Sequence, residues 1–246
     1  MIIDAHAHMD ECEIRGWYDT PERVIGFMDR FGIDKAVVST YRNAPETDNA
    51  PMEYIVEGCK KYPDRLIPFL RLNPRAGKKA VALLEFAVEQ HAVKGVKLHP
   101  ASYNLPPFGG ITVEIMKKAA YYDIPVLFHC ADELMTYPIQ IGDAMDESPD
   151  TKVILAHMGG FFHKKDAIEL MKRCPNAYTD TCEFPFSAGI RAFIEELGPD
   201  RIFFGTDLPT DNPAFEIEKI RILGLGQEIE EKLFCRNIAS LLKIQV

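Results

Sequence analysis

The chain has 246 residues, of which 47% are hydrophobic, and 37 acidic against 28 basic residues give it a net charge of −9. This length is close to the roughly 250 residues of a (β/α)8 barrel, so one domain spanning residues 1–246 suffices. The acidic balance and the lack of any Lys/Arg run argue against nucleic acid and anionic membranes as partners.

Apolar stretches rich in β-branched and aromatic residues alternate with amphipathic stretches along the whole chain. This alternation predicts parallel βα units, and eight strands are the number that closes a barrel. The predicted strands are 2–6, 35–40, 66–71, 95–99, 125–129, 152–157, 177–181 and 201–206.

Capping residues mark where the predicted helices begin and end. Thr20 precedes Pro21 at the start of the first helix, which stops at Gly32, and Pro51 opens a second that stops before Pro63. The other predicted helices are 76–91, 112–122, 137–146, 163–174, 188–197, 213–223 and 227–242. A doubly wound open sheet shows the same alternation of strands and helices. The polar residues at the strand ends therefore have to distinguish the two folds.

Polar residues stand at the ends of five of these strands: His6, His8, His99, His129, His157 and Asp207. Side chains alternate along a strand, so His6 and His8 share a face, and the same parity pairs Leu155 with His157 on the inner face. Only a closed barrel brings the ends of the first, fifth, sixth and eighth strands around one point. We therefore predict an α/β protein with a single-domain (β/α)8 TIM barrel and a metal site at its C-terminal rim.

Five short runs carry a resemblance to a known family: IDAHAH, GVKLHP, PVLFHC, ILAHMGG and FGTDLP, in this order over nearly the whole chain. Together they resemble the amidohydrolase superfamily, and more narrowly the amidohydrolase-related branch with amino-carboxymuconate-semialdehyde decarboxylase-like enzymes and several lactonases. The resemblance implies that a divalent metal, usually zinc, binds to His6, His8, His129 and Asp207. It also implies that His157 polarises the substrate or assists proton transfer.

The donor chemistry agrees with this resemblance. Three imidazoles and a carboxylate suit Zn²⁺ and also accommodate Mn²⁺ or Fe²⁺. Bound zinc lowers the pKa of its water to about 7, and the resulting hydroxide attacks carbonyl groups. Asp207 is then the candidate general base, and His157 the candidate group that stabilises the oxyanion. The first expectation is a metal-dependent hydrolase of a small amide, ester or lactone that also carries a carboxylate.

Four further residues are candidates for substrate binding. Arg42 and Arg71 stand at or just after the ends of the second and third strands, where a guanidinium group could bind a substrate carboxylate or form a structural ion pair. The Lys97 ammonium would be repelled by a metal unless it is carboxylated, paired with a carboxylate such as Asp207, or displaced, and we favour the last two states. His99 either lines the pocket or bonds a neighbouring loop.

Alternative functions use the same residues. A nonoxidative decarboxylase (carboxy-lyase) would employ the same metal site and use the arginines to orient a carboxylate. Metal-dependent nucleases of the TatD type share the HxH start, but they place a glutamate where this chain has Lys97 and His99. A barrel that binds metal without catalysis is a further alternative, because a fold does not guarantee a function.

Location and partners are expected from the rest of the composition. Six cysteines are scattered without a CxxC pair, as is typical of reduced thiols. Asp4, His6 and His8 follow Met1 almost at once, where a signal peptide would need apolar residues. We expect a cytoplasmic protein that acts on a small molecule, and the sequence does not determine its oligomeric state.

Overall fold

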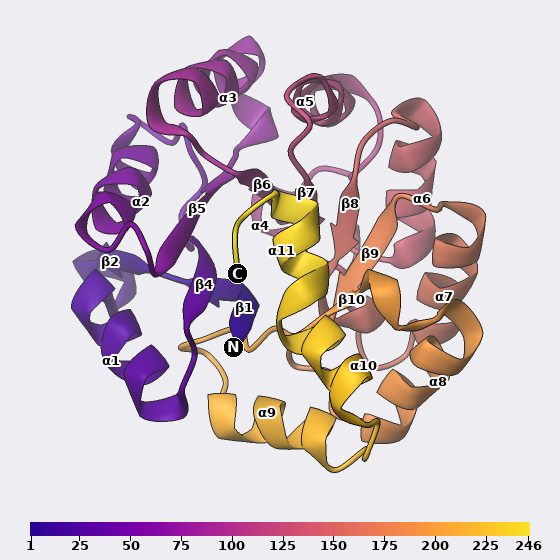
Figure 1. Ribbon diagram of the computed structural model, residues 1–246. Helices are drawn as coiled ribbons and strands as arrows, with labels where there is room; N and C mark the ends of the chain where they lie inside the picture. The colour runs from indigo at the N-terminus through magenta and orange to yellow at the C-terminus, as the bar shows by residue number, and fades with distance from the viewer.

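Eight parallel strands form the centre of the molecule in a computed structural model that describes residues 1–246 (Figure 1). Neighbouring strands follow one another in chain order. The strands are β1 (Ile3–His8), β4 (Lys35–Ser39), β5 (Leu66–Arg71), β6 (Gly95–Leu98), β7 (Val126–Phe128), β8 (Val153–Leu155), β9 (Ala177–Asp180) and β10 (Ile202–Phe203). All eight predicted strands are confirmed, with ends that differ by a few residues.

The sheet closes where the segment after β10 returns to β1. The backbone N–H of Ala5 donates to the carbonyl of Phe204 at 2.9 Å, and that of Asp207 donates to the carbonyl of His6 at 2.8 Å. The predicted TIM barrel is therefore confirmed. Closure places residues from both ends of the sequence side by side.

A ring of helices covers the outside of the barrel in Figure 1. These helices are α1 (Pro21–Phe31), α2 (Ala50–Lys61), α3 (Lys78–His91), α5 (Gly110–Tyr121), α6 (Pro138–Glu147), α7 (Lys164–Arg173), α8 (Ser187–Leu197) and α9 (Pro213–Arg221). The hydroxyl of Thr20 accepts from the N–H of Arg23 at 3.2 Å, and Gly32 ends α1 with a φ of 70°, as their residue types predict. Short 3₁₀ turns lie at Glu13–Arg15, Pro74–Ala76, Ala156–Gly159 and Pro199–Arg201.

The predicted C-terminal helix is one helical stretch in three parts. It comprises α10 (Gln227–Glu231), a π-helical segment (Lys232–Arg236) and α11 (Asn237–Leu242). Ile238 and Leu242 of α11 pack in one cluster with the inward-facing Ile3 and Phe69. Figure 1 shows α11 passing close to the barrel axis near both termini, so this helix covers the N-terminal mouth.

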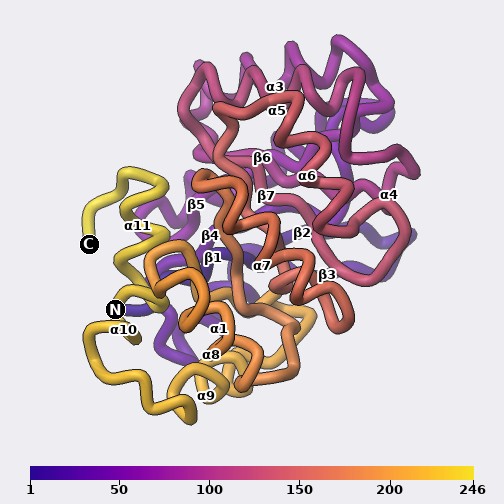
Figure 2. The backbone as a smooth tube through the Cα atoms, turned by 90° about the vertical axis from the view of Figure 1, so that its right-hand side faces the viewer, coloured from indigo at the N-terminus to yellow at the C-terminus, as the bar shows by residue number.

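The sequence did not predict three short elements. β2 (Asp10–Cys12) and β3 (Trp17–Asp19) form an antiparallel hairpin, and α4 (Pro100–Tyr103) is a single turn. Elements of three or four residues are too short to show a periodic pattern. Figure 2 places these elements at the right, opposite α11 and the termini. They therefore add to the rim formed by the carboxyl ends of the strands.

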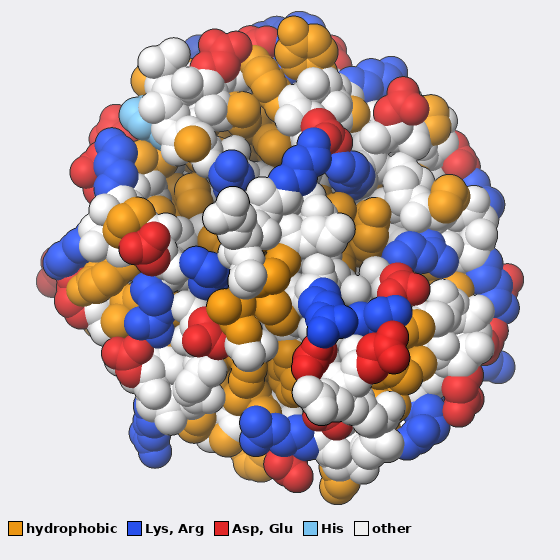
Figure 3. Space-filling view, viewed as in Figure 1, with side chains coloured by type: hydrophobic (Ala, Val, Ile, Leu, Met, Phe, Trp, Pro, Cys, Tyr) orange, Lys and Arg blue, Asp and Glu red, His pale blue; other side chains and the backbone are white.

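The face around the termini carries charges of both signs. Figure 3 shows Lys and Arg side chains interspersed with Asp and Glu over this face. This face therefore offers no patch of a single sign to an oppositely charged partner.

None of the helices combines the length and the apolar character needed to cross a membrane.

A β-bulge decides which side chains of β1 face inward. Between Asp4 and Ala7, β1 advances three residues while β4 advances two, from Ala36 to Val38. Ala5 belongs to the inner cluster and Ala7 to the outer one, although a regular strand would place both on the same face. The extra residue turns His6 and His8 inward, beyond Ala5 along the strand.

The parity expected for β8 is wrong. Leu155 packs in the outer cluster, whereas Ile154 and Ala156 face the barrel interior. His157 still reaches the site because the backbone turns through left-handed conformations at His157 and Met158, with φ values of 58° and 52°. A local turn therefore achieves what we expected from strand alternation.

Replacing Gly95 by Ala should destabilise the barrel. A Cβ atom at this position would lie 2.4 Å from the ring of Phe69, which fills the interior beside it. Such overpacking costs roughly 1 to 3 kcal/mol. Urea unfolding measures the loss, with Gly26→Ala in α1 as the control, because its Cβ would meet nothing within 4 Å. The control should gain stability from helix propensity, and a stable Gly95→Ala variant would contradict this packing.

Candidate metal centre and active site

His6 and His8 of β1 and Asp207 form a buried group of three potential metal ligands. Their donor atoms all lie within 4.8 Å of one another. The Nε2 atoms of His8 and His6 lie 3.0 and 3.3 Å from Oδ1 of Asp207. Neither contact has hydrogen-bond geometry, so this buried oxygen has no donor. A cation between these three atoms would satisfy all of them.

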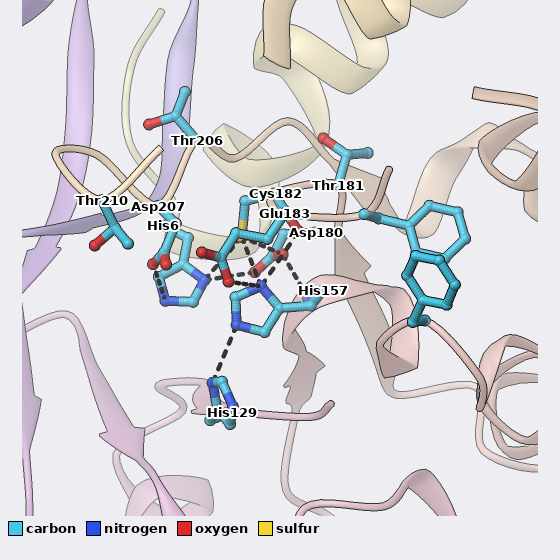
Figure 4. A network of polar contacts seen from close by, with 12 residues as sticks. His6, His129, His157, Asp180, Thr181, Cys182, Glu183, Thr206, Asp207 and Thr210 are labelled. Atoms are coloured by element: carbon cyan, nitrogen blue, oxygen red, sulfur yellow. Dashed lines mark hydrogen bonds and ion pairs between the residues drawn. The ribbon is translucent and has the colours of Figure 1, made fainter. Parts of the chain in front are cut away.

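Each imidazole of the group is fixed through its other nitrogen. Nδ1 of His6 lies 3.1 Å from Oδ2 of Asp180, and Nδ1 of His8 lies 3.3 Å from the carbonyl oxygen of Ser39 (Figure 4 shows His6, Asp180 and Asp207). Both partners accept, so each Nδ1 carries the proton and donates it. Each Nε2 then carries the lone pair and is the atom through which a metal would bind.

The local electrostatics favour the protonation states that a metal requires. Burial, together with the Lys97 ammonium, lowers the pKa of His6 to about 4, and burial also lowers the pKa of His8. Burial opposes ionisation of Asp207, but the imidazoles of His6 and His8 hold its pKa well below the ordinary value. Neutral imidazoles and an ionised carboxylate are the forms that bind metal, so this site fits a divalent cation.

Asp180 organises the residues beneath this group, and the sequence analysis missed it. Its Oδ1 accepts from the backbone N–H of His157 and from the thiol of Cys182, both at 2.9 Å, while Oδ2 accepts from His6 (Figure 4). Burial opposes its ionisation, but His6 keeps its pKa below the ordinary value. Asp180 stands at the end of β9, so the strand-end rule could have identified it.

His129 lies beside the three-residue group, not within it. One nitrogen of His129 is 3.1 Å from Nε2 of His157, and the other is 3.1 Å from a carboxylate oxygen of Glu133. The ring of His99 stacks on His129, with centroids 3.9 Å apart. The structure thus brings together three of the four predicted ligands and holds the fourth against His157.

Lys97 contacts the nitrogen that we assign to the metal. Its ammonium lies 2.7 Å from Nε2 of His6. Burial lowers the pKa of Lys97 to about 8, partly opposed by Asp207, so the group is mostly charged at neutral pH. Of the two states that we favoured, the ion pair with Asp207 is not formed, and the ammonium contacts His6 instead.

The structure separates the two arginines that the sequence treated alike. Arg42 donates from Nη2 and Nε to the fully buried Asp10, at 2.7 and 3.0 Å. A buried carboxylate requires such a partner, so Arg42 has a structural role and does not line the cavity. Of the two roles left open for Arg42, the structure shows the ion pair and not contact with the cavity.

Arg71 does line the cavity and has no carboxylate partner. It is 5% exposed, and its donors reach only the side-chain oxygen of Asn43 at 2.9 Å and the carbonyl of Thr40 at 3.5 Å. Burial lowers the pKa of Arg71 to about 10, so the group remains charged at neutral pH. Because buried charges are normally paired, Arg71 is prepared for an anion brought by a ligand.

A cavity of about 570 Å³ connects Arg71 with the ligand group. Aromatic rings form part of its wall, because Tyr41 stacks on His8 at 4.6 Å and the tilted ring of Trp17 lies 4.9 Å from Tyr41. Its charged lining residues are Arg15, Glu46, Arg71, Arg75, Lys97 and Asp207. Cations outnumber carboxylates, so the cavity suits a small anion.

Replacing Asp180 by Asn should weaken metal binding roughly 10- to 100-fold, the usual effect of losing a carboxylate that orients a metal-binding histidine. Competition with a chelator measures the affinity. Asp166→Asn is the matched control, because Asp166 contacts Nδ1 of His163 at 3.0 Å on an exposed surface. Equal metal affinity in the Asp180 variant and the parent protein would exclude this role.

Comparisons with known proteins place the barrel in a family. A model of the amidohydrolase family matches residues 3–244, whereas a search of curated proteins finds no match. Among solved structures, 2,6-dihydroxybenzoate decarboxylase from Rhizobium has a TM-score of 0.77 at 18% identity, with 98% of each chain covered. The 5-carboxyvanillate decarboxylase of Novosphingobium aromaticivorans, complexed with manganese, has a TM-score of 0.80 at 15% identity, over 99% of this chain and 96% of that chain.

A third similar structure, 4-oxalomesaconate hydratase from Rhodopseudomonas palustris, has a TM-score of 0.71 at 17% identity. The structural alignment covers 99% of this chain and 96% of the hydratase chain. At these identities the structural likeness concerns the fold, whereas the family model spans almost every residue. The chain therefore belongs to the amidohydrolase family of metal-dependent enzymes.

Proposed function

We propose that this enzyme removes the carboxylate of a small, flat acid as CO₂ in a metal-dependent, nonoxidative decarboxylation. The observation that carries the proposal is the buried, unpaired Arg71 in the same cavity as His8 and Asp207. A substrate carboxylate would supply the missing anion and would leave the metal ligands free to hold the cation. Because the guanidinium group is already in place, the enzyme does not have to rearrange when the substrate carboxylate binds.

The comparisons support decarboxylation over the hydrolysis that the sequence placed first. Two of the three similar structures are decarboxylases of aromatic acids, and one of them is complexed with manganese. A hydrolase substrate would need an additional acid group to pair with Arg71, whereas in a decarboxylation the reacting carboxylate itself is the partner. An isotope-labelling experiment distinguishes decarboxylation from hydrolysis.

In this proposal, His6, His8 and Asp207 hold the metal and His129 is the fourth ligand. Two or three imidazoles with one carboxylate suit Zn²⁺, our first choice, and also Mn²⁺ or Fe²⁺. When bound, the metal supplies a Lewis acid that polarises a substrate oxygen.

The remaining residues bind the substrate and move the proton. Arg71 orients the carboxylate, and a cation on His6 would repel the Lys97 ammonium toward the cavity, where it joins Arg71. As the bond to the carboxylate carbon breaks, its electron pair stays on the neighbouring carbon, which takes up a proton. Because Asp207 is ionised, we assign to it the relay of this proton from a water molecule in the cavity to the carbon, and we assign stabilisation of the developing charge to His157.

Isotopes in the product separate the two reactions. The enzyme, loaded with Mn²⁺ or Zn²⁺, is incubated with aromatic and dienoic acids, 2,6-dihydroxybenzoate among them, and with a parallel set of amides, esters and lactones. Decarboxylation in D₂O should release CO₂ and place one deuterium on the carbon that lost it. Turnover only of the esters, amides or lactones, with ¹⁸O from labelled water in the product, would replace this proposal with hydrolysis.

Replacing Arg71 by Met should lower kcat/KM for the acid roughly 10- to 150-fold, which corresponds to about 1.5 to 3 kcal/mol for a charge-assisted hydrogen bond. The methyl ester of the same acid should bind the parent and the variant equally well. Arg42→Met is the matched control: it should unfold at lower urea, because Asp10 loses its partner, yet keep its preference for the acid. Equal kcat/KM for Arg71→Met and the parent enzyme would exclude Arg71 as the carboxylate site.

A further inference from the structure

The hydroxyl of Tyr103 is buried in the cavity without a hydrogen-bond partner. Tyr103 ends α4, directly after β6, and only 4% of the residue is exposed. Its oxygen is nevertheless one of the few buried side-chain atoms that neither donate nor accept a hydrogen bond. Burying a hydroxyl in this way is unfavourable, and folded proteins usually avoid it.

Such atoms are not spread evenly over the molecule. There are four of them: Nδ1 of His99, the hydroxyl of Tyr103, Oδ1 of Asp207 and Oε2 of Glu216. The first three residues line the cavity, whereas Glu216 lies on α9 outside it. A random defect of packing would not gather in one cavity, so these atoms point to ligands. Asp207 faces the metal ligands, which leaves His99 and Tyr103 for the substrate.

The surroundings of Tyr103 determine what kind of atom it needs. Burial raises the pKa of the Tyr103 phenol despite the opposing Arg71 charge, so the hydroxyl keeps its proton and acts as a donor. A guanidinium group also has only donors. The side-chain oxygen of Asn43 already accepts from Arg71. The cavity therefore has donors in excess at this point, and an oxygen of an anionic ligand is the complementary acceptor.

We propose that Tyr103 is a specificity-determining residue whose hydroxyl donates to the substrate carboxylate beside Arg71, and that Nδ1 of His99 contacts an adjacent polar group of the same substrate. This inference rests on the proposed function only in that both place the substrate carboxylate at Arg71. Stacking on His129 fixes the His99 ring, so its free nitrogen keeps one position. Both residues come from the short segment that follows β6.

The proposal makes the two effects of Tyr103→Phe opposite in sign. In the free protein the substitution removes a hydroxyl that has no partner, so the melting temperature should stay the same or rise. In the complex it removes a hydrogen bond to an anion, so the affinity for the acid should fall roughly 10-fold or more. A residue that only supported the fold would lose stability and leave the affinity unchanged.

Equilibrium binding tests this separately from catalysis, and binding heats are taken only from acids that the enzyme does not decarboxylate during the titration. Calorimetry on the Mn²⁺-loaded enzyme compares 2,6-dihydroxybenzoate and benzoate, both at millimolar concentration, with their methyl esters. Tyr103→Phe should lose affinity for the acids and little for the esters. Tyr122→Phe is the matched control, because its hydroxyl donates to Glu89 at 2.6 Å outside the cavity, and it should bind like the parent.

Three outcomes would overturn the proposal: a lower melting temperature for Tyr103→Phe than for Tyr122→Phe, unchanged affinity for the acids, or no binding of either acid by the parent enzyme. A failure of the proposed reaction looks different. Acids that bind and depend on Tyr103, but release no CO₂, would reject decarboxylation and keep the recognition role.

Discussion

Closure of the barrel between β1 and the segment after β10 is the constraint on which the site depends. The backbone N–H of Asp207 donates to the carbonyl of His6 at 2.8 Å, so the bond that completes the barrel also sets the Asp207 carboxylate against the imidazoles of His6 and His8. No local segment could build this group, because its members come from opposite ends of the sequence. Folding and assembly of the metal ligands are therefore one event.

The cavity keeps two unmet requirements of opposite sign close together. Oδ1 of Asp207 has no donor, whereas the Arg71 guanidinium has no carboxylate partner and the Tyr103 hydroxyl has no acceptor. Each is unfavourable in the free protein, and together they favour a state that holds both a metal and an acid. Lys97 partly relieves the first requirement, because its ammonium lies against His6. Such a site lowers the stability of the free enzyme, but it holds the binding groups in the positions that the ligands require.

Much of the fold and part of the site follow from local patterns. Eight apolar stretches with helices between them predict the barrel because burial on both faces makes parallel strands continuously apolar. The position of His6, His8 and Asp207 at strand ends predicts their convergence because all parallel strands end at the same rim. Asp180 was equally visible at the end of β9. The hairpin β2–β3 and α4, with Tyr103, left no periodic signal.

The sequence by itself determined the order of strands and helices and the chemistry available at the rim, since both depend on residues that are neighbours in the chain. Only the tertiary structure decided which side chains use that chemistry. A bulge in β1 turns His6 inward, and left-handed backbone at His157 does the same after β8. Arg42 and Arg71 both stand near the carboxyl end of a strand, yet Asp10 pairs with Arg42, and Arg71 has no carboxylate partner. Burial and ion pairing depend on distant segments that only folding brings together.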